Sequence, residues 1–598
     1  MLKGRLNIKL NKYYLGLFAI SLLVTLPYWI NFGFVPNGTD LPFHLGSRYF
    51  AALEGFKDGQ IIPQVNPLQN NGQGFGALIF YGPTVSYIFA LVYSIIPNLY
   101  VVLTLMVIVQ VFFCGFSMYK LVKYCWNNPR MAFFAGVFYI ANPWMTSCLY
   151  RSGQYGSLTA MIFIPLVILA IFRIYRHERG ALLLSISASL IVTSHMLSVW
   201  ITGLLCLLIF FLKIRSLDKY VLTNFVKAIL GAVGFCAFFT LPMIMAYHSG
   251  IYNISRPSNE FSMTKIGSFI GGTMHYLDPW NQDSSALLFY PVFVCLICQI
   301  IFAIIIKIKG KKIFQNQFLI LAVILEIISL ILSSSYLPWR KMPSVFLIVQ
   351  FPSRYLIIFF LVNSILMAIL LDKIYKWLKS HRKTKKIYSV KLLSFVILAI
   401  LTFGFALPLG VEAIKQTALD NTKVLQEFGS ENSVWNEYQN VSNSQSVEKL
   451  KQGGIVPEYF AYPINAKAQA TILAQIPDKP ALNPFINNYK KNGTHITFSV
   501  KSFGKNPDQV TNIKLPVLYY DGYQAQDESG KKLQVNNQNG YVQVVVPSMY
   551  SGQIKVHFGM SVWTSIGFGI TLLSFAITLS WFLLRKILTI RKTRKNKK

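Results

Sequence analysis

Residues 36–83 read PNGTDLPFHLGSRYFAALEGFKDGQIIPQVNPLQNNGQGFGALIFYGP and follow the first apolar run of the chain directly. Asp40 occupies the N-cap position of a helix that a Leu-Pro pair opens. Apolar side chains then recur at near-helical spacing, which predicts an amphipathic helix lying on the membrane surface. His44 and Arg48 follow Asp40 at successive steps of four residues, so these three side chains should share one edge of that helix.

The rest of this stretch is too rich in Pro, Asn and Gly to cross lipid. Residues 82–97 form a short apolar segment, for which we predict a helix that dips into the interface without spanning the bilayer. A full span here would place the basic segment 120–130 outside, against the positive-inside rule.

The composition is that of a multi-pass membrane protein: 54% of the 598 residues are hydrophobic and 13% are charged. Apolar runs of about 20 residues are long enough to cross a bilayer. Twelve such runs are predicted, at 13–34, 99–118, 131–148, 158–172, 181–197, 198–211, 220–247, 286–306, 314–333, 355–371, 392–409 and 562–584.

The net charge of +34 could suggest a nucleic-acid partner, but the cations lie in short segments between apolar runs. This is the positive-inside pattern, which places both termini in the cytoplasm and excludes nucleic acid as the expected partner. The Lys-, Asn- and Ile-rich composition favours a bacterial cytoplasmic membrane. The seven cysteines give no disulfide or metal pattern. The inner segments are too short for a nucleotide-binding domain, so an activated donor outside should be carried by a lipid.

The long polar region 410–560 is predicted to lie outside the membrane. Its second half alternates apolar and polar residues at 494–501, 513–520, 541–546 and 553–558, which predicts a small β-sandwich. We therefore expect a polytopic α-helical membrane protein with an extracytoplasmic β-sandwich-like domain before the last transmembrane helix. The expected units are a membrane domain (1–409) with outer loop 35–98, the outer domain (410–560), and a last span with a basic tail (561–598).

Sugar transfer from a lipid phosphate needs a base for the acceptor proton and cations for the departing phosphate. Asp40 is placed to be the base. Arginines on the outer side are the candidate phosphate ligands, because a guanidinium fork matches phosphate oxygens. Arg151 and Arg354 stand nearest to the start of returning helices. Two simpler interpretations stay open. Asp40 could serve only as a helix cap, and the two arginines could serve only as anchors to lipid headgroups.

Other polar residues also have a structural interpretation beside the functional one. His44 could simply be a surface partner of Asp40, and His195 could simply be a hydrogen-bonded histidine at the end of a helix. Glu326 is an acid inside an apolar run, where acids usually face the bundle interior or a polar path. Gln110 and Asn363 are both candidate partners for it.

The order of several short motifs resembles the GT-C superfamily of membrane glycosyltransferases. More narrowly, it resembles the bacterial YfhO-like membrane proteins, also labelled "6-pyruvoyl-tetrahydropterin synthase related". The motifs are Gly38-Thr39-Asp40-Leu41-Pro42-Phe43-His44, Phe80-Tyr81-Gly82-Pro83, Tyr150-Arg151-Ser152-Gly153, Ser194-His195, Gln350-Phe351-Pro352-Ser353-Arg354 and Leu515-Pro516-Val517-Leu518-Tyr519-Tyr520-Asp521-Gly522-Tyr523.

This resemblance implies a GT-C-like fold and transfer of a sugar from a polyprenyl-phosphate donor to an envelope polymer or lipid, with inversion at the sugar carbon. It implies Asp40 as catalytic base. The expected substrate-binding residues are His44, Arg48, Tyr81, Arg151, His195, Arg340 and Arg354.

One departure from the family pattern matters. The second outer connection has no carboxylate where many GT-C members carry one, so we predict no metal and no other cofactor. No histidine triad supports the pterin label. The alternatives to an enzyme are a transporter or flippase of lipid-linked sugars and a non-enzymatic envelope assembly protein.

Overall fold

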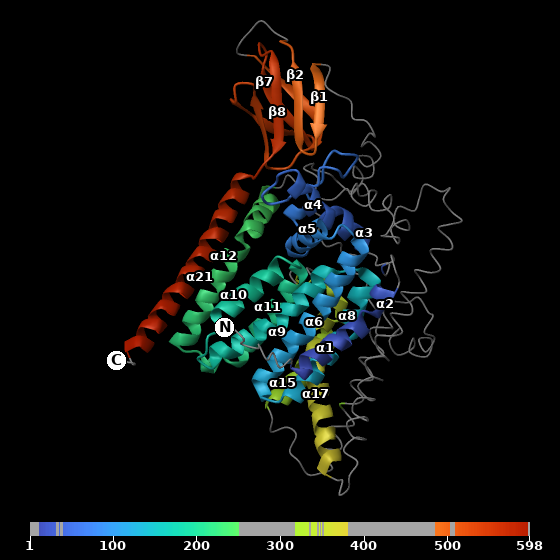
Figure 1. Ribbon diagram of the computed structural model, residues 1–598, viewed down its shortest axis with the longest axis vertical. Helices are drawn as coiled ribbons and strands as arrows, with labels where there is room; N and C mark the ends of the chain where they lie inside the picture. Colours follow the sequence, from blue (N-terminus) through green and yellow to red (C-terminus); the bar gives the residue numbers. More distant parts are fainter. Residues whose placement is uncertain are drawn as a thin grey trace, which may run out of the picture.

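The computed structural model describes residues 11–30, 35, 40–249, 299, 317–333, 337–343, 346, 349, 352–380, 485–502 and 509–595, with the backbone only at a few of them, including Arg151 and Arg340. The described chain forms a bundle of helices with a β-sandwich at one end (Figure 1). The predicted run 392–409 and residues 410–484 lie outside the described residues, as does the predicted run 286–306 apart from residue 299.

The helices follow the predicted apolar runs, with shifts at their ends. The helical elements are α1 Lys12–Val24, α2 Leu26–Ile30, α3 Leu41–His44, η1 Leu45–Tyr49, α4 Phe50–Lys57, η2 Ala77–Ile79, α5 Thr84–Ile95, α6 Leu99–Trp126, α7 Pro129–Ile140, α8 Pro143–Ser147, η3 Cys148–Ser152, α9 Tyr155–Tyr175, α10 Ala181–Val192, α11 Met196–Leu212, η4 Ile214–Ser216, α12 Lys219–Ser249, α15 Gln317–Leu332, η7 Trp339–Lys341, η8 Pro352–Tyr355, α17 Leu356–Ser380 and α21 Val562–Lys595.

Asparagine caps explain where several helices begin. The side chains of Asn98, Asn128 and Asn142 accept a hydrogen bond from the backbone N–H three residues on, and proline follows two of them. Within the described chain, five helices are long and apolar enough to cross a membrane: Leu99–Trp126, Tyr155–Tyr175, Lys219–Ser249, Pro352–Lys376 and Val562–Thr589. Helix α5, in the segment 82–97 for which we predicted a helix that does not cross the bilayer, has 12 residues, fewer than a transmembrane helix needs.

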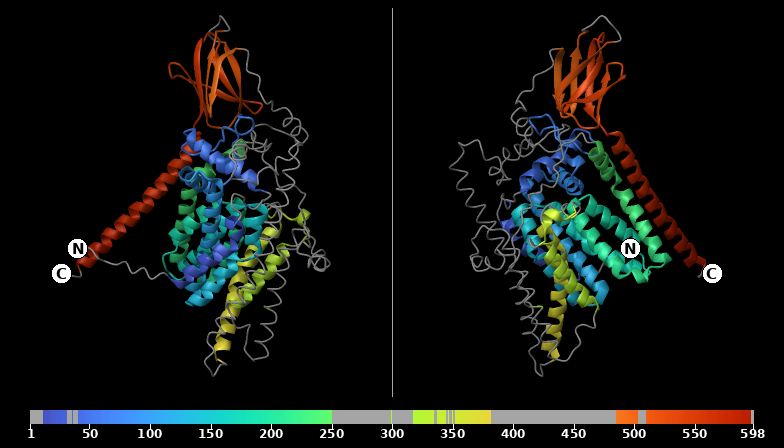
Figure 2. Two further views of the ribbon diagram at one scale, coloured as in Figure 1. Left: turned by 45° about the vertical axis from the view of Figure 1, so that its right-hand side comes forward. Right: turned by 180° about the vertical axis from the view of Figure 1, so that it is seen from behind.

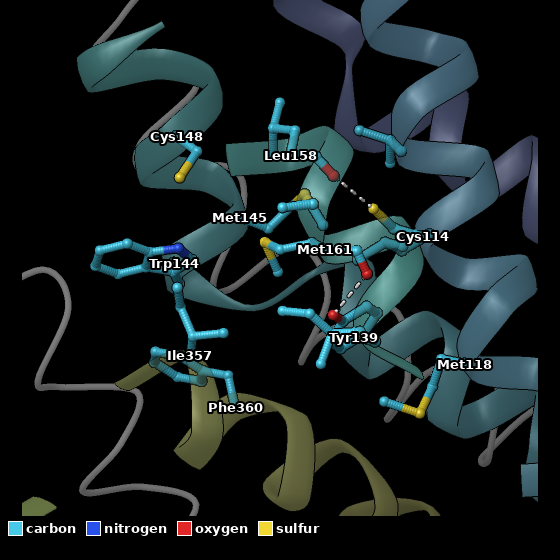
Figure 3. Packing of buried hydrophobic residues seen from close by; sticks show 14 of the residues in the cluster. Cys114, Met118, Tyr139, Trp144, Met145, Cys148, Leu158, Met161, Ile357 and Phe360 are labelled. Carbon is cyan, nitrogen blue, oxygen red and sulfur yellow. Dashed lines mark hydrogen bonds between the residues drawn. The ribbon is translucent and has the colours of Figure 1, made fainter. Parts of the chain in front are cut away.

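The centre of the bundle is packed from α6, α7, α8, α9 and α17 (Figure 3). The Cys114 thiol donates to the Leu158 carbonyl at 3.5 Å, and the Tyr139 hydroxyl donates to the Met161 carbonyl at 2.9 Å. These bonds satisfy polar atoms that the apolar core would otherwise leave without partners.

A buried ion pair joins α7 to α17 at the end of the bundle away from the sandwich. Arg130 Nε donates to Asp372 Oδ1 at 2.9 Å, and Lys376 Nζ lies 2.8 Å from Asp372 Oδ2. The Arg130 guanidinium also lies 3.6 Å from the centre of the Tyr375 ring. The acid is thus surrounded by cations where the basic connections gather.

Helices α12 and α21 run side by side along the edge of the bundle (Figure 2). Small residues allow the close approach: a Cβ on Gly567 would lie 2.4 Å from the Ala237 carbonyl oxygen. The Thr571 hydroxyl donates to the Gly234 carbonyl at 3.0 Å. Packing through small residues and hydroxyls is typical of helices in lipid.

The C-terminal strands form two facing sheets, as predicted. The five-stranded sheet has the order β1-β2-β8-β4-β5 and the three-stranded sheet the order β3-β7-β6, all antiparallel. The strands are β1 Ile486–Asn492, β2 His495–Val500, β3 Val510–Leu518, β4 Tyr523–Asp527, β5 Lys532–Leu533, β6 Val535–Gln538, β7 Tyr541–Pro547 and β8 Gly552–Phe558. The four predicted strands correspond to β2, β3, β7 and β8.

The sandwich shares its hydrophobic core with residues 65–80 of the first outer loop. Leu518 N donates to the Gln73 carbonyl at 2.8 Å. At the end of α4, Asp58 Oδ1 accepts from Thr494 N at 2.9 Å, and Asp58 Oδ2 accepts from the Thr494 hydroxyl. The loop therefore packs as part of the sandwich.

The predicted helix is present at 41–57 as α3, η1 and α4. The prediction that it is amphipathic and lies on the membrane surface was wrong. Residues 45–53 are buried on every side, the polar Ser47 and Arg48 included. Loop residues cover the polar face: Gln69 Nε2 donates to the Ser47 hydroxyl at 2.8 Å, and Asn66 Nδ2 donates to the Gly46 carbonyl at 3.2 Å. The helix edge that carries Arg48 is therefore inside the protein.

Candidate active site

Asp40 lies where the first and second outer connections meet. Its backbone N–H donates to the Ser152 carbonyl at 3.1 Å, and its Oδ2 accepts from Gln154 Nε2 at 2.6 Å. Gly153 has φ +64° and packs so closely on Leu41 that a Cβ there would lie 2.7 Å from the Leu41 Cβ. The two connections thus hold the carboxylate in one position.

The predicted second outer loop is a turn of π-helix, η3, which ends at Gly153. Arg151 lies in it, one residue before the Asp40 contact at Ser152, and its side chain is outside the described atoms. The other π-helical turn, η1, carries Arg48. Single π-helical turns are frequent at functional sites, because they shift the side chains that follow.

Arg48 is 2% exposed and is held by neighbouring groups. Its Nη1 lies 3.1 Å from His44 Nδ1, and its Nη2 donates to the Gly82 carbonyl at 2.9 Å. The guanidinium also stands 4.9 Å from the centre of the Tyr81 ring. The predicted edge of helix 41–57 and the Tyr81-Gly82 motif therefore meet at Arg48.

His195 lies at the turn between α10 and α11, as predicted. Its Nδ1 lies 2.8 Å from the Ser198 hydroxyl. Burial, and then the guanidiniums of Arg354 and Arg48, lower the pKa of His195 from 6.5 to about 3. Burial, with Arg48 and His195, lowers the pKa of His44 well below its usual value. Both imidazoles are therefore neutral at physiological pH.

Arg354 comes from η8, directly before α17, and is 6% exposed. Its Nη1 donates to the Val349 carbonyl at 2.8 Å. Its charge interacts with the Asp40 carboxylate and with Tyr81, and it acts on His195 as well. Two segments far apart in the chain thus place a guanidinium and a carboxylate in one site.

Six predicted site residues have described side chains, and the contacts above connect all six: Asp40, His44, Arg48, Tyr81, His195 and Arg354. Arg340 lies in η7, with its side chain outside the described atoms. Sequence reasoning missed Gln154 as a site residue. Its position in the second outer connection could have indicated it, because Gln154 stands where many GT-C members carry an acid.

The described side chains of the site combine two guanidiniums, one carboxylate and two neutral imidazoles. Two positive charges against one negative suit an anionic ligand, and a buried position strengthens that attraction relative to water. The carboxylate can accept a proton close to where such an anion would bind. Among the described residues, no group of three or more His, Cys, Asp or Glu could hold a metal ion. Metal independence stays a prediction.

Fold and site together define a helical membrane protein with a charged, partly buried site beneath a β-sandwich. The chain belongs to the family described as "6-pyruvoyl-tetrahydropterin synthase related domain; membrane protein", whose model matches residues 78–409. The family resemblance predicted from the motifs is thereby confirmed. The matched stretch contains Tyr81, His195 and Arg354, and begins after Asp40, His44 and Arg48.

Similar proteins include an uncharacterized protein of Lactococcus lactis subsp. cremoris (strain MG1363), 26% identical over 98% of this chain and 97% of that protein. Among solved structures, the apo oligosaccharyltransferase of Archaeoglobus fulgidus matches 76% of this chain with 12% identity and a TM-score of 0.40, and this chain spans only 62% of that one. ArnT from Cupriavidus metallidurans, bound to undecaprenyl phosphate, matches 90% of this chain and 98% of its own with 12% identity and a TM-score of 0.36. These scores do not establish a shared fold.

Proposed function

We propose that this protein is a membrane glycosyltransferase of the GT-C type. It moves a sugar from a polyprenyl-phosphate donor to an envelope polymer or lipid on the outer face of the cytoplasmic membrane. The observation that carries the proposal is the convergence of one carboxylate, Asp40, with two buried guanidiniums, Arg48 and Arg354.

In the proposed step, a hydroxyl oxygen of the acceptor attacks the anomeric carbon of the donor sugar. The hydroxyl proton goes to the Asp40 carboxylate. The bond between the anomeric carbon and the phosphate oxygen breaks, and its electron pair leaves with polyprenyl phosphate. One direct displacement with one base gives inversion at the anomeric carbon.

The arginines stabilise the charge that grows on the phosphate oxygens as this bond breaks. Arg354 and Arg48 are the proposed phosphate ligands, with Arg151 and Arg340 as further candidates. Nδ1 of neutral His44 accepts from Arg48, so its Nε2 carries the proton and can donate to a phosphate or sugar oxygen. Nδ1 of His195 faces Ser198, which leaves its Nε2 for a sugar hydroxyl. Tyr81 completes the proposed substrate contacts from the position below Arg48.

The charge distribution supports an outward-facing site. The connections at the end of the bundle away from the site carry the basic residues Lys120, Lys123, Arg130, Arg173 and Arg176. The site end carries the sandwich and the loop packed on it (Figure 1). The positive-inside rule then places the site and the sandwich outside.

Gln154 has a positioning role in this proposal. Its amide donates to the Asp40 carboxylate at 2.6 Å and holds it in one orientation for proton transfer. An amide stands where many GT-C members carry a second carboxylate, so among the described residues Asp40 is the one acid of this contact. We propose a reaction that uses no divalent metal.

The test is Asp40→Asn in the full-length protein, expressed in a strain that lacks the native gene. Sugar content of the envelope polymers and lipids is measured by mass spectrometry. We expect the variant to insert in the membrane and unfold at the same temperature as wild type, but to lose the sugar modification. The matched control is Asp218→Asn, because Asp218 caps α12 through Val221 N at 2.8 Å and asparagine caps equally well.

A transporter or an assembly protein would not need a proton acceptor at Asp40. Normal sugar content with folded Asp40→Asn would therefore refute the enzymatic role of Asp40 and favour one of these classes. Native mass spectrometry of undecaprenyl phosphate binding shows whether a variant has lost the chemical step or has lost donor binding. Asp40→Asn should retain this lipid.

A further inference from the structure

An acid is buried inside α15, within an apolar helix that carries no other charged residue. Glu326 is 1% exposed, and the helix reads QFLILAVILEIISLIL. The described site at Asp40 makes no use of it. Ionisable groups at such positions usually mark a polar path or a functional site.

Two amides face the carboxyl from other segments. Gln299 Nε2 donates to Glu326 Oε1 at 3.1 Å, and the Asn363 side chain on α17 interacts with the same carboxyl. The second oxygen, Oε2, and the Asn363 Nδ2 are both fully buried and make no hydrogen bond among the described residues. The carboxyl thus has two neutral amides beside it and no charged partner among the described residues.

No charged group in the described chain acts on Glu326; the two amides are its only partners. The elements packed against α15 are η8 and α17. The charge on η8 is Arg354, which interacts with Asp40. Helix α17 also carries charges towards the other end of the bundle, where Lys376 pairs with Asp372: Asp372, Lys373, Lys376 and Lys379.

An ionised carboxylate at this place would cost several kcal/mol, because two neutral amides cannot replace water or a counter-ion. A proton on Oε2 removes the charge. The O–H can then donate a hydrogen bond to the amide oxygen of Asn363, once that side chain turns its oxygen towards Glu326. Protonation therefore removes the cost of a buried charge.

We propose that Glu326 is a proton-binding site within the membrane, where a neutral carboxylic acid joins α15 to α17. Release of the proton would place a charge in the contact between these helices. Asn363 lies nine residues after Arg354, about 14 Å along a helix, so the same contact supports the segment that carries the site arginine.

The test is modification by dicyclohexylcarbodiimide, which crosses membranes and reacts with protonated carboxyls in apolar surroundings. The carboxyl proton moves to a carbodiimide nitrogen, the carboxyl oxygen bonds to the central carbon, and rearrangement leaves a stable acylurea. Full-length protein in vesicles is treated at pH 7 and digested, and the Glu326 peptide is examined by mass spectrometry. We expect an adduct on Glu326. We expect none on Asp372, the ion-paired acid of α17, and none at position 326 in the Glu326→Gln variant.

Two outcomes would overturn the proposal. Failure of Glu326 to react between pH 6 and pH 8 would mean that the carboxyl carries no exchangeable proton. Protection of Glu326 by sodium or potassium chloride, and not by choline chloride, would mean that the ligand is a metal cation. The assay needs no transferase activity, so its result does not depend on the reaction proposed above.

A second measurement separates proton binding from simple packing. Unfolding of the wild-type protein releases the Glu326 proton above the ordinary range of a free Glu carboxyl, so its unfolding temperature should fall as pH rises from about 5 to about 7 and then level off. Glu326→Gln keeps the shape and the neutral charge and should show a smaller fall. Equal pH dependence in both proteins would contradict a proton on Glu326.

Discussion

The contact between Gln154 and Asp40 gives the most direct test of the site. Gln154→Ala removes an amide donor that lies 2.6 Å from the carboxylate oxygen. A hydrogen bond to a charged group contributes about 1.5–3 kcal/mol, and this contact is half-buried, so the lower value applies. A loss of about 1.5 kcal/mol in the transition state lowers the rate about tenfold.

The same substitution should lower kcat more than it changes KM for the donor. The amide fixes the orientation of the carboxylate and does not itself bind the donor in the proposed reaction. Gln154→Glu should be more damaging near neutral pH, because two carboxyls in contact share a proton. The initial rate of sugar transfer is measured in membrane vesicles across pH 5 to 9.

Gln553→Ala, a substitution at an exposed glutamine of β8, is the matched control and should leave the rate unchanged. If folded Gln154→Ala has the wild-type rate, the amide does not position the Asp40 carboxylate. The proposed positioning role would then be wrong.

Arg354→Gln should weaken binding of undecaprenyl phosphate at least tenfold by native mass spectrometry, because it removes a buried charge-assisted donor; undiminished binding would exclude Arg354 from the phosphate site. The pKa of His195 is lowered to about 3, so the unfolded chain binds a proton below pH 6.5 that the folded protein does not, and the folded protein loses stability as pH falls. His195→Gln should therefore reduce the fall in unfolding temperature between pH 6.5 and 4. An unchanged slope would contradict a neutral buried imidazole. Asp58→Ala should cost about 2–3 kcal/mol and raise hydrogen exchange at Thr494 and in β2, while protection equal to wild type would show that this contact does not hold the sandwich. Gly82→Ala should lower the unfolding temperature, because its Cβ would lie 2.5 Å from a backbone oxygen of the α10–α11 turn; an unchanged temperature would mean that this turn moves freely.

Hydropathy predicted the long helices well, because a run of apolar residues has few alternatives to a helix in lipid. Their ends were less predictable. Helix α6 was predicted to end at Met118 and continues to Trp126, since the basic residues that mark the membrane boundary are also good helix formers. In the sandwich, β1 was missed because its sequence, INNYKKN, has few strand-forming residues and gains its place by pairing with β2.

The site was predicted in part for a similar reason. The i+4 spacing placed His44 beside Arg48, which is a local property of a helix. That Arg354 would meet Asp40 was a hypothesis from outer-side charge, and only the packing of distant helices brings the two together. Burial of helix 41–57 was not predictable, because the side chains that cover it come from a loop without periodic pattern.

The hydrophobic core shared by residues 65–80 and the C-terminal strands also constrains biogenesis. The ribosome completes the early half of that core long before the late half, with most of the transmembrane helices made in between. Apolar side chains such as Phe75 and Phe80 must therefore wait without their partners until the last strands are made, and in the proposed topology they wait on the outer side of the membrane. A chain truncated before β1 would leave them uncovered, so quality-control proteases should remove prematurely terminated copies.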